Sequence, residues 1–207
     1  MKSLKKSSTA VVFDLGGVLL DWNPRHLYRK IFDSDEAAME SFLAEICTRE
    51  WHYHHDLGRS FAEGAKLLSK HYPEKTELIR VWGERFDEMV RGSIKGTVDI
   101  LAELHAGKTP LYALTNYPAE AFHVVKKRFE FFNWFLGVVV SGEEKLAKPD
   151  PRIFRVLIDR YKIDPRQTVF IDDTEKHVAA ANGLGLIGIS FTSPQVLRVE
   201  LQALGLL

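Results

Sequence analysis

The chain has 207 residues, of which 45% are hydrophobic and 27% charged, a composition typical of a globular protein with one sizeable domain or a core domain plus a modest insertion. Basic and acidic residues balance at 28 each, which argues against a protein that coats nucleic acid. The single cysteine, Cys47, rules out an internal disulfide framework and is typical of a reducing compartment.

The basic start of the chain, residues 1–8, is predicted to be a tail. Asp14 interrupts the apolar run that follows, so we expect no signal peptide, and no stretch of the sequence reaches the roughly 20 apolar residues of a membrane span. We therefore expect a cytoplasmic protein without a membrane or nucleic-acid partner. The sequence does not distinguish a monomer from a homodimer.

The first predicted element is a buried strand that ends in a carboxylate. The apolar, β-branched run Val11-Val12-Phe13 is followed by Asp14, and Gly16 and Gly17 come shortly after it. Glycines let a ligand approach the main chain, and ligands of open α/β sheets bind at the carboxyl ends of the strands. Taken alone, the pattern favours an ordinary turn after the strand.

The next part of the chain shows only helical periodicity. Between Asn23 and Gly92 apolar residues recur at helical spacing in three stripes. We interpret residues 23–92 as an all-helical insert, and residues 9–22 with 93–207 as the α/β core that it interrupts.

From Gly92 onwards, short apolar strands alternate with helices. The strands are predicted at Pro110–Leu114, Gly137–Ser141, Thr168–Ile171 and Leu186–Ile189. They lack the alternation of half-exposed strands, so we expect a Rossmann-like α/β fold: a parallel sheet of about five strands with helices on both faces.

Polar groups follow four of these strands: Asp14, then Thr115-Asn116, then the loop with Lys148, then Asp172-Asp173. Each has a structural explanation on its own, as a helix cap for Thr115 or a surface side chain for Lys148. In a parallel sheet, however, all four lie along one edge. Carboxylates from two strands suit Mg²⁺, a strand-end aspartate can act as a nucleophile, and a hydroxyl, backbone amides and a lysine can hold phosphate oxygens. The set therefore favours phosphoryl transfer.

The same residues fall into four ordered motifs: Phe13-Asp14-Leu15-Gly16-Gly17-Val18, Leu114-Thr115-Asn116, Ala147-Lys148-Pro149-Asp150-Pro151 and Ile171-Asp172-Asp173. In this set and order the sequence resembles the haloacid dehalogenase superfamily of hydrolases. The resemblance is to its phosphatase branch with a helical cap inserted after the first strand (subfamily I). It covers essentially the whole chain apart from the tail, and the cap is identified by its position rather than by a motif.

The resemblance implies a magnesium site and a nucleophile. Asp14 would be the nucleophile and a metal ligand, and Gly16 would offer its main-chain carbonyl to the metal. Asp173 would bind Mg²⁺ directly, and Asp172 directly or through water.

The resemblance also implies a phosphate site. Thr115 and the Asn116 amide would bind phosphate, with the backbone at Gly17 beside them, and Lys148 would bridge nucleophile and phosphate. The catalytic set is thus Asp14, Thr115 and Lys148.

Two positions depart from the family pattern. Most family phosphatases carry a second aspartate two residues after the nucleophile, as the general acid for the leaving group, and here that position is Gly16. General acid catalysis is typically worth about 10²–10⁴-fold, so turnover of poor leaving groups is in question. His177 stands where many relatives carry an acid or an amide, which weakens the expectation of a further contact there.

The predicted insert contains a histidine-rich stretch, Trp51–Arg59. A zinc site is disfavoured because the sequence offers no convincing ligand set beyond Asp56. We expect the stretch to end a helix that overhangs the sheet edge, where His55, Asp56 or Arg59 contacts substrate; His55 and Arg59 are our candidate substrate-binding residues.

The leading hypothesis is a Mg²⁺-dependent phosphatase that hydrolyses a small phosphorylated metabolite, with a sugar phosphate as one candidate, through an aspartyl-phosphate. One alternative is a metal-independent haloacid dehalogenase, against which the pair Asp172-Asp173 argues, because two acids repel a carboxylate substrate. The other is a catalytically weak phosphometabolite-binding module, for which Gly16 is the support.

Overall fold

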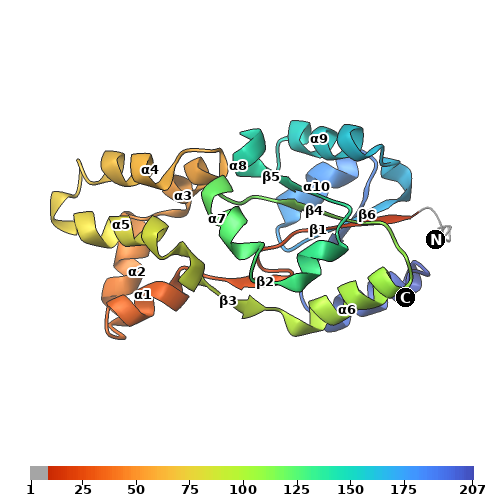
Figure 1. Cartoon of the computed structure of the whole chain (residues 1–207), viewed down its shortest axis with the longest axis horizontal. Helices are drawn as coiled ribbons and strands as arrows, with labels where there is room; N and C mark the ends of the chain where they lie inside the picture. The colour runs from red at the N-terminus through yellow and green to blue at the C-terminus, as the bar shows by residue number, and fades with distance from the viewer. Residues whose placement is uncertain (1–8) are drawn as a thin grey trace.

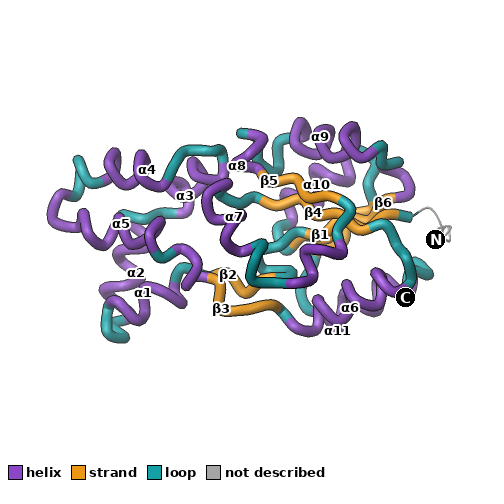
Figure 2. The backbone as a smooth tube through the Cα atoms, in the orientation of Figure 1, coloured by secondary structure: helices purple, strands orange, loops and turns teal. Residues whose placement is uncertain are grey.

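A five-stranded parallel sheet forms the centre of the protein in a computed structural model, which describes residues 9–207. The predicted tail, residues 1–8, lies outside the described residues. In spatial order the strands are β5 (Gly137–Val140), β4 (Leu111–Thr115), β1 (Ala10–Phe13), β6 (Thr168–Asp172) and β7 (Ile187–Ser190). The predicted α/β class is confirmed (Figure 2).

Helices cover both faces of this sheet. Successive residues of β1 point to opposite faces: Val11 and Phe13 belong to one apolar cluster and Val12 to another. The first cluster includes side chains of α6 (Lys95–Ala106), α7 (Ala119–Val125), η3 (Glu130–Trp134) and α11 (Pro194–Ala203). The second includes those of α9 (Pro151–Tyr161) and α10 (Glu175–Gly183), and η4 (Pro165–Gln167) precedes β6. Burial on both faces explains why the strands read as continuous apolar runs.

A helical cap is inserted between β1 and β4 and lies at one end of the molecule (Figure 1). Its own core includes the buried side chains of Met39, Phe42, Ile79 and Trp82. The insertion that the sequence predicted is confirmed. Its elements are α1 (Arg25–Ile31), α2 (Glu36–Glu45), α3 (Arg49–Asp56), α4 (Phe61–Leu68), η1 (Pro73–Lys75), α5 (Thr76–Glu84) and η2 (Phe86–Met89).

A short antiparallel ribbon, not predicted from the sequence, joins the cap to the core. It consists of β2 (Leu20–Trp22) and β3 (Val90–Ser93), with Leu20 opposite Ser93 and Trp22 opposite Val90. Arg128 of the core donates a hydrogen bond to the carbonyl of Val90. The chain therefore enters and leaves the cap through two neighbouring strands.

The cap also contacts the core beyond this ribbon, at the carboxyl ends of the sheet strands. The rings of Phe86 and Tyr117 pack edge to face at 5.6 Å between centroids. The end of α3 contacts α8 (Ser141–Glu144), which directly follows β5 (Figure 1). Within residues 9–207, none of the helices has the length and apolar character needed to cross a bilayer.

Candidate active site

Three carboxylates meet where β1 and β6 end. The two strands pair in parallel with Phe13 beside Ile171, so the residues that follow are brought to one place. One carboxylate oxygen from each of Asp14, Asp172 and Asp173 lies within 4.8 Å of the others. In the part of the chain that the structure describes, these three form the one cluster of acidic, histidine or cysteine side chains with the spacing of a metal site.

A buried lysine joins two of these carboxylates. The Lys148 ammonium group donates to Asp172 at 2.6 Å and to the carbonyl of Leu114 at 2.9 Å, and its Nζ lies 3.0 Å from Asp14 Oδ1. Burial alone lowers the pKa of a lysine, but here the two carboxylates outweigh burial and raise the pKa of Lys148. The lysine is therefore a fixed positive charge at the sheet edge.

The cluster carries more negative charge than this lysine offsets. Burial raises the pKa of Asp14 to about 8, Lys148 opposes the rise, and Asp172 and Asp173 add to it. Burial, together with Asp172, also raises the pKa of the more exposed Asp173. Three carboxylate oxygens beside one ammonium group are the donor set and charge balance that suit a hard divalent cation, so the residues present fit a magnesium ion.

Asp172 is held from both of its carboxylate oxygens. One oxygen accepts from Lys148, and the other accepts from the Thr174 amide at 2.9 Å and lies 3.0 Å from His177 Nδ1. Burial opposes ionisation, but Lys148 and His177 outweigh it and lower the pKa of Asp172 to about 2. From the sequence, His177 weakened the expectation of a further contact at this position. The structure shows such a contact, because the His177 ring lies against one carboxylate oxygen of Asp172.

Gly17 makes room for Asp173. Its φ is +75°, in the left-handed region, and a Cβ at this position would overlap the Asp173 carboxylate. Among the described residues, a Cβ at Gly16 would meet no atom within 4 Å. The structure therefore explains the glycine at position 17, whereas no described atom hinders a side chain at position 16.

We expect Gly17→Ala to lower the free energy of unfolding by about 1–2 kcal/mol, because a side chain in the left-handed region costs this much, and to displace Asp173. The matched control is Gly16→Ala. Thermal unfolding with and without Mg²⁺ measures both effects. A Gly17→Ala protein with unchanged stability and an unchanged response to Mg²⁺ would contradict this reading of the turn.

The end of β4 offers a buried hydroxyl. Thr115 is fully buried, and its Oγ1 has no hydrogen-bond partner among residues 9–207. The neighbouring Asn116 side chain is engaged: it accepts from the Lys148 amide at 2.8 Å and donates to the Lys148 carbonyl at 3.0 Å. The Asn116 side chain thus positions the lysine, a role that the sequence did not indicate.

The two cap residues expected to contact substrate lie elsewhere in the structure. His55 is fully buried inside the cap, where its ring packs against Trp51 and Phe61 and its Nδ1 lies 3.0 Å from the carbonyl of Arg59. It follows Trp51 by four residues and so shares the buried face of α3. Arg59 lines a cap cavity of about 470 Å³ together with Trp51 and Tyr72. The structure does not bring either residue to the acidic cluster.

The fold and this site agree with the comparisons with known proteins. Residues 9–185 match the haloacid dehalogenase-like hydrolase family, and the chain belongs to that family. It is therefore an enzyme of this hydrolase family, whose phosphatase members are among its relatives.

Two curated relatives are phosphatases. The chain is 24% identical to the sesquiterpene phosphatase astK of Aspergillus oryzae, over 94% of this chain and 95% of the relative. It is 27% identical to a phosphorylated carbohydrates phosphatase of Thermotoga maritima, over 86% of this chain and 82% of the relative. Among solved structures, a haloacid dehalogenase family enzyme from Bacteroides thetaiotaomicron, in complex with magnesium and inorganic phosphate, shares the fold with a TM-score of 0.68 and 22% identity. That match covers 90% of this chain and 95% of the other.

Proposed function

We propose that the protein is a Mg²⁺-dependent phosphatase that hydrolyses a small phosphorylated metabolite through an aspartyl-phosphate on Asp14. The observation that carries the proposal is the single constellation at the sheet edge. There a strand-end carboxylate lies 3.0 Å from a buried ammonium group, beside two further acids and a buried hydroxyl that has no hydrogen-bond partner among residues 9–207. Dehalogenation needs no metal site, whereas the acidic cluster supports one.

Each residue has a defined task in this reaction. Asp14 attacks phosphorus with one carboxylate oxygen, and the backbone amide of Leu15, which donates to Asp14 at 2.7 Å, helps to fix its direction. Lys148 neutralises charge between nucleophile and phosphate, and Thr115 is placed to donate its hydroxyl to a phosphate oxygen. Asp14, Asp172 and Asp173, with the Gly16 carbonyl, would hold a magnesium ion. When bound, that ion supplies positive charge next to the transferring phosphoryl group.

The burial of the nucleophile and the relatives support the proposed substrate class. The cap contacts the core at the carboxyl ends of the sheet strands, and Asp14 is only 7% exposed, which favours a small ester. Sugar phosphates are the first candidates, in line with the Thermotoga maritima relative, and a sesquiterpene phosphate ester is the second, in line with the Aspergillus oryzae relative.

The test is phosphate release from a panel of sugar phosphates, a sesquiterpene phosphate and an activated aryl phosphate, each with Mg²⁺ and with a chelator. We expect release that requires Mg²⁺. We also expect Mg²⁺, at a hundred times its dissociation constant, to raise the free energy of unfolding by about 2.7 kcal/mol. Asp173→Asn should weaken both effects, while Asp159→Asn, an exposed aspartate of α9, serves as the matched control.

The outcomes separate the alternatives. Chelator-insensitive release of halide from a halogenated acid would replace the proposal with dehalogenation. Binding of phosphate esters without turnover, in folded protein with Mg²⁺ present, would favour a binding module.

A further inference from the structure

The proposed reaction leaves one requirement unmet, a proton for the leaving group. Gly16 has no side chain to supply it, although the space around a Cβ there is free of any described atom within 4 Å. Without an acid the leaving oxygen departs as an anion, which is costly for sugar or alkyl esters. A donor from another part of the fold would remove that cost.

The cap brings a carboxyl group to this place. Asp56 is the last residue of α3, the helix whose end contacts α8 above the sheet edge. Two residues further on, Gly58 has a φ of +93°, and a Cβ there would lie 2.9 Å from the carbonyl oxygen of Gly142 in α8. This close backbone approach fixes the end of α3 against the core (Figure 1).

One oxygen of the Asp56 carboxyl is buried without a hydrogen-bond partner among residues 9–207. The residue is 7% exposed, and its Oδ1 accepts no hydrogen bond from any residue that the structure describes. The His52 Nε2 is 3.6 Å away, too far for a hydrogen bond. An unsatisfied buried polar atom costs about 1–3 kcal/mol, so its retention calls for an explanation.

Two site residues act electrostatically on this carboxyl. The charges of Asp14 and Lys148 both act on the pKa of Asp56, Asp14 raising it and Lys148 lowering it. Asp56 thus lies within electrostatic range of the residues at the strand ends, although the cap contributes it.

The surroundings keep Asp56 in its acid form. Burial within the cap, the largest cause, raises the pKa of Asp56 to about 8; Asp14 adds to the rise and Lys148 opposes it. Burial also lowers the pKa of His52 to about 3, so that ring is neutral and does not pair with an Asp56 carboxylate.

We propose that Asp56 is the general acid and base of this enzyme, in place of the aspartate that Gly16 lacks. The proposal rests on the phosphatase function proposed above. As Asp14 attacks phosphorus, the bond from phosphorus to the leaving oxygen breaks, and that oxygen keeps the electron pair and takes the proton of Asp56. Water then attacks the phosphorus of the aspartyl-phosphate and gives a proton to the Asp56 carboxylate. The bond between phosphorus and Asp14 breaks, which releases inorganic phosphate and restores both aspartates.

The test is the dependence of kcat/KM on the leaving group in Asp56→Asn, measured with a series of aryl and alkyl phosphates of increasing alcohol pKa. We expect kcat/KM of Asp56→Asn to be about 10²–10⁴-fold lower than that of the wild type for the alkyl esters. This difference should become steadily smaller as the leaving alcohol becomes more acidic. Introducing Gly16→Asp into the Asp56→Asn protein places a carboxyl in the open position beside the nucleophile, and recovery of alkyl phosphate hydrolysis there supports the proposal.

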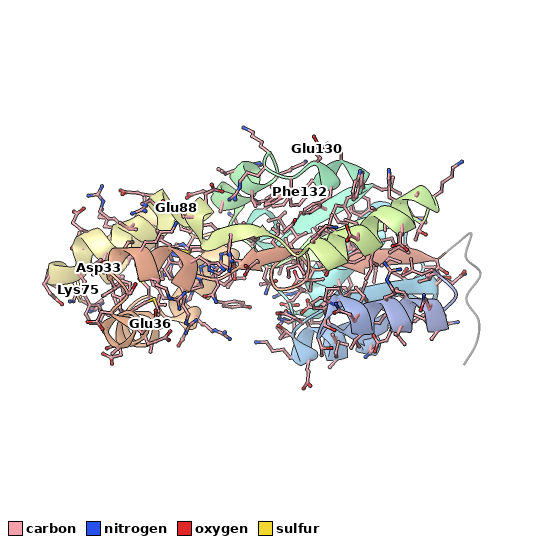
Figure 3. All side chains as sticks on the ribbon, turned by 90° about the horizontal axis from the view of Figure 1, so that it is seen from below. Asp33, Glu36, Lys75, Glu88, Glu130 and Phe132 are labelled. Carbon is pink, nitrogen blue, oxygen red and sulfur yellow. The ribbon has the colours of Figure 1, made fainter. Side chains whose placement is uncertain are left out.

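The control is Asp33→Asn, the same substitution at the exposed end of the cap far from the sheet (Figure 3). A loss in Asp56→Asn that is equal for all esters, or no loss, overturns the role of Asp56 however the double variant behaves. A wild-type protein that releases phosphate from none of the esters overturns the phosphatase function itself, and with it this proposal.

Discussion

Asp14→Asn is expected to lower phosphatase activity by at least about 10⁴-fold, because removing a covalent nucleophile typically costs this much or more. The amide keeps the shape of the side chain but cannot form the aspartyl-phosphate. Since burial raises the pKa of Asp14, the ionised carboxylate destabilises the metal-free fold, so the variant should be at least as stable as the wild type in chelator.

Phosphate release from the activated aryl ester measures the loss of activity. Thermal unfolding of the same samples in chelator measures the stability. The matched control is Asp99→Asn, an exposed residue paired with Lys95 on α6. A folded Asp14→Asn protein that keeps about a tenth or more of the wild-type kcat would exclude Asp14 as the nucleophile.

Lys148→Met is expected to lower the free energy of unfolding by about 3–5 kcal/mol, the usual cost of removing one partner from a buried ion pair. The methionine fills a similar volume, but Asp14 and Asp172 then lose their shared positive neighbour. The effect should shrink when Mg²⁺ is present, because a cation at the cluster offsets part of the uncompensated charge.

The pH dependence of the free energy of unfolding is a second test of the Lys148–Asp172 ion pair. In the wild type the pKa of Asp172 is about 2 against its usual 3.8, so its ionised form stabilises the fold above about pH 4, and that contribution is lost as the pH falls towards 2. In Lys148→Met the lowering by Lys148 is gone, so stability should fall less steeply in this range. Chemical denaturation between pH 2 and 7 measures this, with the exposed Lys95→Met as the control. If the stability of Lys148→Met and of Lys95→Met fell equally steeply with decreasing pH, Lys148 would not be what lowers the pKa of Asp172.

The fold and most of the strand-end site could be predicted because both depend on local patterns. Strands buried on both faces read as continuous apolar runs, and the parallel register of β1 with β6 then brings Asp14 and Asp172 together. The helical insert was equally visible from its periodicity. These features need no knowledge of which side chains meet across the fold.

The rest depends on contacts between distant segments. The ribbon of β2 with β3 pairs Leu20 with Ser93, and each strand is too short to show a period. The burial of His55 was set by the packing of α3 against Phe61 rather than by its polar character. The two hydrogen bonds between the Asn116 side chain and the Lys148 backbone likewise join two loops that lie side by side only in the folded sheet.

The most direct test of the central claim is the mass of the Asp14-bearing peptide after acid quenching of the enzyme during turnover of the activated aryl phosphate with Mg²⁺. The account predicts a gain of one phosphoryl group on that peptide, removed by hydroxylamine and absent from Asp14→Asn. Rapid turnover with no phosphoryl group on this peptide at any quench time would contradict it.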